Sequence, residues 1–231
     1  PPRAGCRPWQ DWFGNMTAPH RIIAIVGLGP KGLYALDALC QAARTIPSQK
    51  FEVHIYEPTP NPGAGPIYDP DQPDILLMNF PAHMIDAWTE GRGPDLVAWM
   101  RENGAGVAAW DYVPRAVVGH YLTWCFERVV ANAPSNIHLS MHSVHVTGLR
   151  RLQSGWVISP GGVAANEVLV TTGHQNWTRE GEADCATFTI PSPFPIDRAL
   201  ATASTATAGT TATRGTVPPG ASVACKGFSL T

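Results

Sequence analysis

The clearest pattern of apolar and polar positions lies near the start of the chain. A short run rich in Ile and Val, residues 22–26, is typical of a buried strand. A glycine-rich turn follows at residues 27–32, and three leucines (33, 36 and 39) then recur at the spacing of one helix face. The pattern therefore predicts a buried strand that turns directly into a helix.

The turn has the spacing G-x-G-x-x-G, with glycine at Gly27, Gly29 and Gly32 and with Pro30 and Lys31 between the last two. In a dinucleotide-binding unit the first glycine permits the tight turn, the second lets the backbone approach a diphosphate, and the third lets helix and strand pack closely. Free N–H groups at the start of the helix would hold the anion. Because the motif stands between a strand and a helix, we interpret it as a dinucleotide-binding site rather than an ordinary glycine turn.

A second strand pattern ends in an acidic residue. Residues 51–56 alternate as a strand does, and Glu57 follows them directly. In this fold an acidic residue at the end of the second strand accepts hydrogen bonds from the adenosine ribose. Glu57 lies thirty residues after Gly27, whereas about twenty is usual. We therefore expect extra length in the first helix or in residues 45–50.

Three later features favour FAD over NAD as the ligand of this first site. Two glycines follow Glu57 within eight residues, and small residues there let the chain pass close to a long cofactor. An apolar segment, residues 74–82, has one polar side chain in its middle. A later strand, residues 166–170, ends in Thr-Thr-Gly, which resembles the Ala-Thr-Gly strand end of two-dinucleotide flavoproteins. The candidate FAD contacts in these three places are Gly65, Asn79, Thr172 and Gly173.

Taken in order, these stretches resemble the N-terminal part of the FAD-NAD(P)-binding protein family, flavoproteins distantly similar to the N-hydroxylating monooxygenases. The matching stretches are residues 25–32, 56–65, 76–79, 113–122, 170–174 and 223–231. The chain departs from the family pattern at Lys31, where a small residue is commoner, and at Ser229, where a glycine of a second glycine turn is expected.

The resemblance implies an α/β fold with a Rossmann-like FAD-binding domain and a parallel sheet. It implies FAD as the cofactor, NAD(P)H as its reductant in the intact protein, and a small-molecule substrate. The function would be that of a flavin-dependent oxidoreductase, and reduced flavin could activate oxygen for monooxygenation. Because the cofactor carries the chemistry, we name no catalytic side chain.

Two other functions stay open at this point. An NAD(P)-dependent dehydrogenase would hold its nicotinamide cofactor in the first site. A non-catalytic nucleotide-binding module would bind a nucleotide without reaction. The glycines after Glu57 and the Thr-Thr-Gly strand end argue against the dehydrogenase.

Between the flavin motifs the pattern predicts a helical insertion and then a small β-meander. Two helices are expected within the insertion, over residues 94–103 and 112–131. We interpret the chain as a fragment of a longer protein with four parts. These are an unassigned extension (1–20), the FAD-binding domain (21–196, with the insertion at 90–135 and the meander at 136–160), an Ala/Thr-rich linker (197–219) and the start of a truncated second dinucleotide-binding unit (220–231).

Composition limits the classes of partner. The net charge of -2, with acids and bases nearly balanced, gives no electrostatic footprint for nucleic acid or an anionic membrane. No apolar run reaches the length of a membrane span. The five cysteines contain no C-x-x-C pair, so a cytoplasmic protein with free thiols is expected. Three nearby histidines, His138, His142 and His145, lack an accompanying carboxylate or cysteine, so we expect no metal site.

Overall fold

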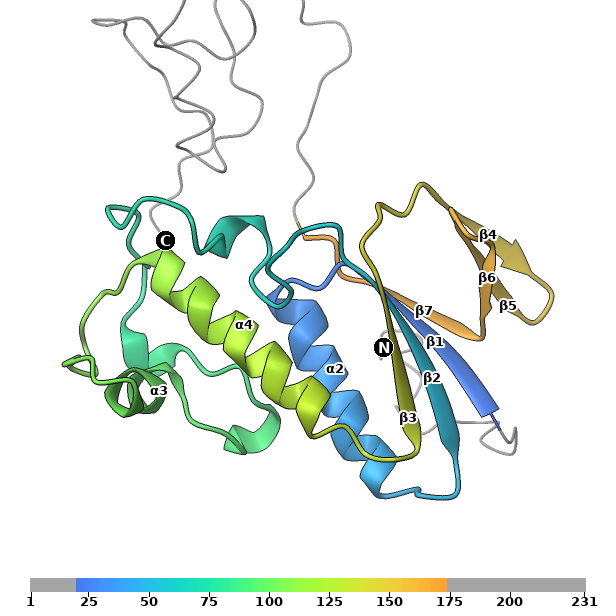
Figure 1. Ribbon diagram of the computed structural model, residues 1–231, viewed down its shortest axis with the longest axis horizontal. Coiled ribbons are helices and arrows are strands. Elements are labelled where there is room, and N and C mark those ends of the chain that lie inside the picture. Colours follow the sequence, from blue (N-terminus) through green and yellow to red (C-terminus); the bar gives the residue numbers. More distant parts are fainter. Residues whose placement is uncertain (1–19, 174–231) are drawn as a thin grey trace, which may run out of the picture.

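The computed structural model describes residues 20–173 of the chain (Figure 1). The linker expected at residues 197–219 and the second dinucleotide-binding unit expected at 220–231, with Ser229, lie outside the described residues. So does the unassigned extension, except for its last residue.

Four parallel strands form the main sheet, in the order β3-β2-β1-β7 (Figure 1). β1 spans His20–Val26, β2 spans Lys50–Tyr56, β3 spans Ile137–His142 and β7 spans Glu167–Val170. β1 has a neighbour on each side, so the turn that follows it begins between two other strand ends. The expected α/β fold class with a parallel sheet is confirmed.

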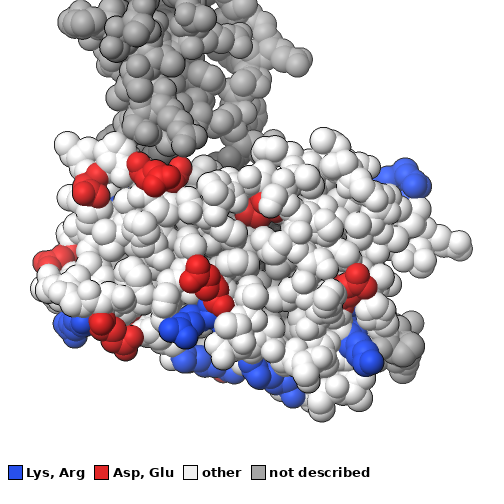
Figure 2. Space-filling model, viewed as in Figure 1, with Lys and Arg blue, Asp and Glu red and all other residues white. Residues whose placement is uncertain are grey.

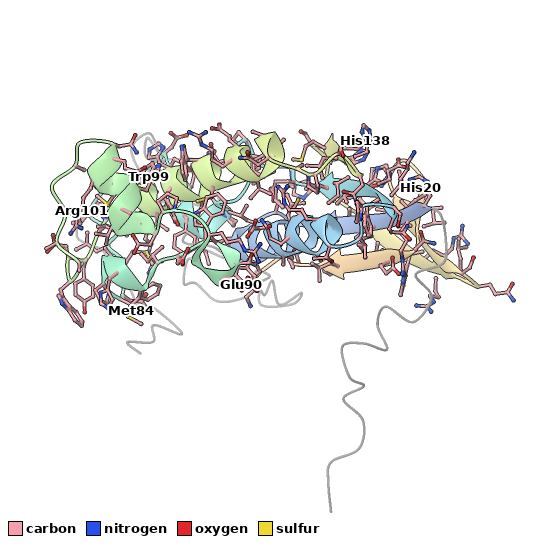
Figure 3. The ribbon with its side chains drawn as sticks, turned by 90° about the horizontal axis from the view of Figure 1, so that it is seen from below. His20, Met84, Glu90, Trp99, Arg101 and His138 are labelled. Atoms are coloured by element: carbon pink, nitrogen blue, oxygen red, sulfur yellow. The ribbon has the colours of Figure 1, made fainter. Side chains whose placement is uncertain are left out.

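Two helices cover one face of this sheet. They are α2 (Pro30–Arg44) and α4 (Arg115–Ala131), and Figures 1 and 3 show both on the same side of the strands. Leu33 and Leu36 of α2 are 1% and 0% exposed, and they belong to the same buried cluster as Val53 of β2. Burying one leucine side chain contributes about 1.5–3 kcal/mol. This core therefore fixes the start of α2 against the carboxyl ends of the strands.

The insertion contains the two expected helices, both of them shorter than predicted. α3 spans Leu96–Glu102, and its N-cap Asp95 accepts a hydrogen bond from the N–H of Ala98 at 2.7 Å. α4 begins at Arg115 rather than at residue 112, because the preceding residues pair with another segment. The carbonyl of Val113 accepts from the N–H of Met78 at 2.9 Å. Three short 3-10 helices lie between β2 and α3, namely η1 (Pro66–Tyr68), η2 (Ala82–Met84) and η3 (Thr89–Gly91).

A three-stranded antiparallel sheet packs on the opposite face of the main sheet. It consists of β4 (Gly148–Leu152), β5 (Gly155–Ser159) and β6 (Val163–Ala165) in that order. Ile158 and Ala165 of this small sheet are buried with Ala24 of β1 and Tyr56 of β2.

The position of the meander corrects the sequence interpretation. We expected residues 136–160 to form it, but β3 pairs in parallel with β2 and belongs to the main sheet. The meander lies over residues 148–165 instead. Both kinds of strand alternate apolar and polar residues when one face is buried, so the pattern does not reveal the pairing partner.

Asn136 closes the connection between α2 and β2 from a distant part of the chain. Its side-chain amide donates to the carbonyls of Ala43, Ile46 and Gln49 at 3.0, 3.2 and 2.9 Å. We expect Asn136→Ala to lower the free energy of unfolding by about 1–3 kcal/mol, because the three carbonyls lose the hydrogen bonds that this side chain donates. Urea unfolding measures the change. In the matched control Asn103→Ala an exposed, local bond to Trp99 is lost, and a change of at most about 0.5 kcal/mol is expected. Equal effects of both variants would contradict the role given to Asn136.

No helix within residues 20–173 is long and apolar enough to cross a membrane. On the face that Figure 2 shows, most of the described surface is uncharged. Red and blue groups lie near one another along its lower edge, so this face carries no continuous charged surface of one sign.

Candidate functional site

The first glycine of the turn is required by the fold itself. Gly27 has a φ of 87°, a conformation that favours glycine, and its N–H donates to the carbonyl of Tyr56 at 2.9 Å. A Cβ atom at Gly27 would lie 2.9 Å from the carbonyl oxygen of Thr171 and from the Cα of Thr172. The turn is therefore held between the ends of β2 and β7.

The third glycine is also required by packing. A Cβ atom at Gly32 would lie 2.5 Å from the carbonyl oxygen of Gly27. The hydroxyl of Thr171 donates to the same carbonyl at 2.6 Å. Helix and turn are thus in direct backbone contact at this point.

The second glycine is different, because nothing in the described chain fills the space beside it. Gly29 has an ordinary extended conformation, with φ of -76°. A Cβ atom there would meet nothing closer than the Cα of Gly65, at 3.9 Å. Protein packing does not explain this glycine, so the open space is the feature that fits a bound ligand.

Gly29 is also the N-cap of α2, followed by Pro30 at its first position. The helical ladder begins with the N–H of Leu33, which donates to the carbonyl of Gly29 at 2.9 Å. The N–H groups of Lys31 and Gly32 precede that bond, and such groups at a helix start attract anions. The exposed Lys31 adds a positive charge in the same turn. The space beside Gly29 is therefore suited to a phosphate group.

The loop after β2 passes close to this turn. Gly65 has a φ of 66°, and a Cβ atom on it would lie 3.3 Å from the Cα of Gly29. Gly63, with a φ of 94°, donates its N–H to the carbonyl of Leu28 at 2.7 Å. The two glycines let the loop form one wall of the space beside Gly29.

Glu57 faces the glycine turn and is 5% exposed. Its Oε2 accepts from the N–H of Leu28 at 2.6 Å. Its Oε1 accepts twice from Thr59, from the N–H at 2.9 Å and from the hydroxyl at 2.7 Å. A carboxylate offers about four acceptor positions, so one position on Oε2 stays available for a ligand hydroxyl.

The remaining predicted site residues differ in how they lie relative to the glycine turn. Thr172 packs directly against Gly27, while Gly173 has a φ of 75° and no described atom within 4 Å of a Cβ built on it. Asn79 is exposed. Its neighbours Met78 and Phe80 line a cavity of about 180 Å³ that Pro30 also lines. Asn79 therefore lies between two residues that line this cavity in the sequence, without lining it itself.

Three contributors to the site were missed by sequence reasoning. They are Leu28, Thr59 and Thr171, which bind Glu57 or Gly27. Leu28 acts through its backbone, which leaves no signal in the sequence. Thr59 stands between Pro58 and Pro60, and a hydroxyl two residues after the acidic residue is the one signal that could have identified it.

A row of polar side chains lies on β2 and β3, on the face of the main sheet that also carries the buried Tyr56. Glu52 lies 2.9 Å from Nε2 of His54, and Nδ1 of His54 lies 2.9 Å from Nε2 of His142. The ring of His142 stacks on that of Tyr56, with 4.5 Å between centroids. The carbonyl of His142 accepts from the N–H of Glu57 at 3.0 Å. Among residues 20–173 no group of three or more His, Cys, Asp or Glu residues could hold a metal ion.

His142 should make stability depend on pH. Burial, and then the nearby His54, lower the pKa of His142 below its ordinary value of 6.5. The unfolded chain therefore takes up the proton more readily, and the free energy of unfolding falls as the pH decreases below 6.5. We expect His142→Gln to reduce this fall, as measured by urea unfolding at pH 7.5 and 5.5.

A matched control for this prediction lies on the same strand. His138 is exposed at the amino end of β3, near His20 and far from Trp99 in Figure 3. His138→Gln should leave the pH dependence unchanged. A pH dependence in His142→Gln identical to that of the unaltered chain would remove His142 as its source.

Comparison with known proteins gives a family match over most of the described chain. The sequence model of a family described as FAD-NAD(P)-binding matches residues 24–175, more than half of the chain. Nitrosuccinic acid synthase from Aspergillus oryzae is 35% identical over 141 residues, which cover 56% of this chain and 22% of that protein. A nitrosuccinate-forming L-aspartate N-monooxygenase from Streptomyces davaonensis is 31% identical over 160 residues, covering 58% of this chain and 24% of that enzyme.

The chain thus spans less than a quarter of the length of these curated relatives. Among solved structures, a variant of the flavin monooxygenase from Stenotrophomonas maltophilia aligns with a TM-score of 0.48 and 18% identity. That alignment covers 74% of this chain and 45% of the monooxygenase.

Proposed function

The chain belongs to the FAD-NAD(P)-binding family, and from this we propose that it forms the FAD-binding part of an NAD(P)H-linked flavin monooxygenase. The observation that carries the proposal is the open space beside Gly29 at the start of α2, since no contact within the described chain requires a glycine there. The glycine turn and Glu57 together offer partners for a diphosphate and a ribose.

In this proposal each group of the site has one task. The N–H groups of Lys31 and Gly32 would donate to the diphosphate of FAD, and the Lys31 ammonium would add charge complementarity. Glu57 would accept a ribose hydroxyl at the free position of Oε2. Gly65 and Thr172 would line the passage, with Asn79 and Gly173 farther along it.

The buried leucine core and the loop around Gly63 and Gly65 would hold these partners rigidly and exclude water from the diphosphate. When bound, FAD would supply the redox chemistry, with NAD(P)H as the reductant in the intact protein. The part of the chain described here would bind and orient the cofactor, and we assign it no proton transfer.

The names of the relatives suggest a substrate class for the intact protein. Two are named for making nitrosuccinate or for oxygenating the nitrogen of L-aspartate. We therefore propose N-oxygenation of the amino group of a small amino acid, in the cytoplasm, as the reaction.

The visible spectrum of the purified chain, recorded after incubation with FAD and removal of free ligand, tests the cofactor. We expect the absorbance bands of an oxidised flavin at close to one FAD per chain. A colourless chain that binds NAD(P) instead would support a dehydrogenase. A chain that binds neither would contradict the proposed function.

A further inference from the structure

The acceptor positions of Glu57 are nearly all in use within the protein. Both positions of Oε1 are taken by Thr59, and one of the two on Oε2 is taken by Leu28. A ribose has two neighbouring hydroxyls, and each can donate one hydrogen bond. Glu57 can therefore accept from one of them without losing a protein donor, and the second hydroxyl needs another acceptor.

The hydroxyl of Thr59, which contacts Glu57 directly, is an acceptor with unused capacity. Its hydrogen is donated to Oε1 of Glu57 at 2.7 Å. A hydroxyl oxygen has two lone pairs besides its one hydrogen, so Thr59 can accept a bond while it continues to donate one. Thr59 is half-buried rather than enclosed, so the residue is partly accessible from outside the chain.

The position of Thr59 is also fixed before any ligand arrives. Pro58 and Pro60 flank it, and a following proline restricts the backbone to extended conformations. The bond from its own N–H to Oε1 of Glu57, at 2.9 Å, holds the residue from the other side. Little ordering of Thr59 is then needed when a ribose binds.

We propose that the Thr59 hydroxyl accepts the second ribose hydroxyl of the FAD adenosine, beside the one that Glu57 accepts. This inference rests on the proposed function, because it presupposes that an adenosine ribose binds at Glu57. The alternative is that Thr59 only orients the Glu57 carboxylate and does not contact the ligand.

Two variants and three ligands separate these possibilities. Thr59→Val keeps the shape and the backbone bond but removes the hydroxyl, and its methyl group covers the direction from which the hydroxyl donated. Thr59→Ser keeps the hydroxyl. Binding of ADP, 2′-deoxy-ADP and 3′-deoxy-ADP to the whole chain is measured by isothermal titration calorimetry, with FAD binding measured in parallel.

We expect Thr59→Val to bind ADP and FAD about tenfold more weakly, since one hydrogen bond is lost, while Thr59→Ser binds as the unaltered chain does. The unaltered chain should bind one of the two deoxy ligands more weakly than ADP. Thr59→Val should bind that same deoxy ligand and ADP with equal affinity. If Thr59→Val loses as much affinity for both deoxy ligands, relative to ADP, as the unaltered chain does, Thr59 does not contact the ribose. The same conclusion follows if Thr59→Val binds ADP with normal affinity. If the unaltered chain binds neither ADP nor FAD, the proposed function itself fails.

Discussion

Replacing Gly29 with alanine should weaken FAD binding by about a hundredfold and leave the fold intact. The new methyl group would fill the space where the diphosphate is proposed to lie, and charge-assisted hydrogen bonds to the start of α2 would be lost. Such bonds contribute about 1.5–3 kcal/mol each, and 1.4 kcal/mol corresponds to a factor of ten. The fold tolerates the change because the closest described atom to a Cβ there is 3.9 Å away. Calorimetric titration with FAD measures the affinity, and urea unfolding measures the stability.

Two controls make the result specific. Gly32→Ala places its methyl carbon 2.5 Å from a backbone carbonyl, so it should lower stability as well as affinity. Gly148→Ala meets nothing within 4 Å in the small antiparallel sheet, so it should change neither. If Gly29→Ala bound FAD with unchanged affinity, the open space at this glycine would have no role in ligand binding.

Glu57→Ala should have the second large effect, and here both stability and cofactor affinity should fall. The carboxylate accepts three hydrogen bonds in a site that is 5% exposed. Its removal leaves the N–H of Leu28 without its acceptor inside the turn. We expect the free energy of unfolding to fall by about 3 kcal/mol or more, together with loss of measurable FAD binding.

The matched control is Glu127→Ala, because Glu127 is exposed on α4. That variant should unfold within about 0.5 kcal/mol of the unaltered chain and bind FAD normally. A Glu57→Ala variant as stable as Glu127→Ala would mean that the carboxylate does not hold the turn.

The local parts of the fold could be predicted because their signals are local. The strand before Gly27, the helix after Gly32 and the acidic end of β2 follow from short patterns of apolar spacing and glycine placement. The Thr-Thr-Gly strand end resembles that of two-dinucleotide flavoproteins, and the strand before it, β7, pairs with β1 beside the glycine turn. Asp95 marks the start of α3 in the same way, through a cap that involves neighbours only.

Features that depend on distant partners could not be predicted. β3 joins the main sheet because it pairs with β2, and nothing within residues 137–142 distinguishes this from pairing in a meander. α4 starts at Arg115 because the residues before it pair with the segment around Met78. By contrast, the roles of Gly27 in the tight turn and of Gly32 in helix–strand packing followed from the motif, and the structure shows that packing requires both glycines and leaves Gly29 open.

A crystal structure of the chain with FAD would show directly where the diphosphate binds. We expect its oxygen atoms within about 3.2 Å of the N–H groups of Lys31 and Gly32, beside Gly29, with a ribose hydroxyl donating to Oε2 of Glu57. FAD bound elsewhere, with the space beside Gly29 still open and Glu57 contacting only Leu28 and Thr59, would contradict the proposal that this turn is the cofactor site.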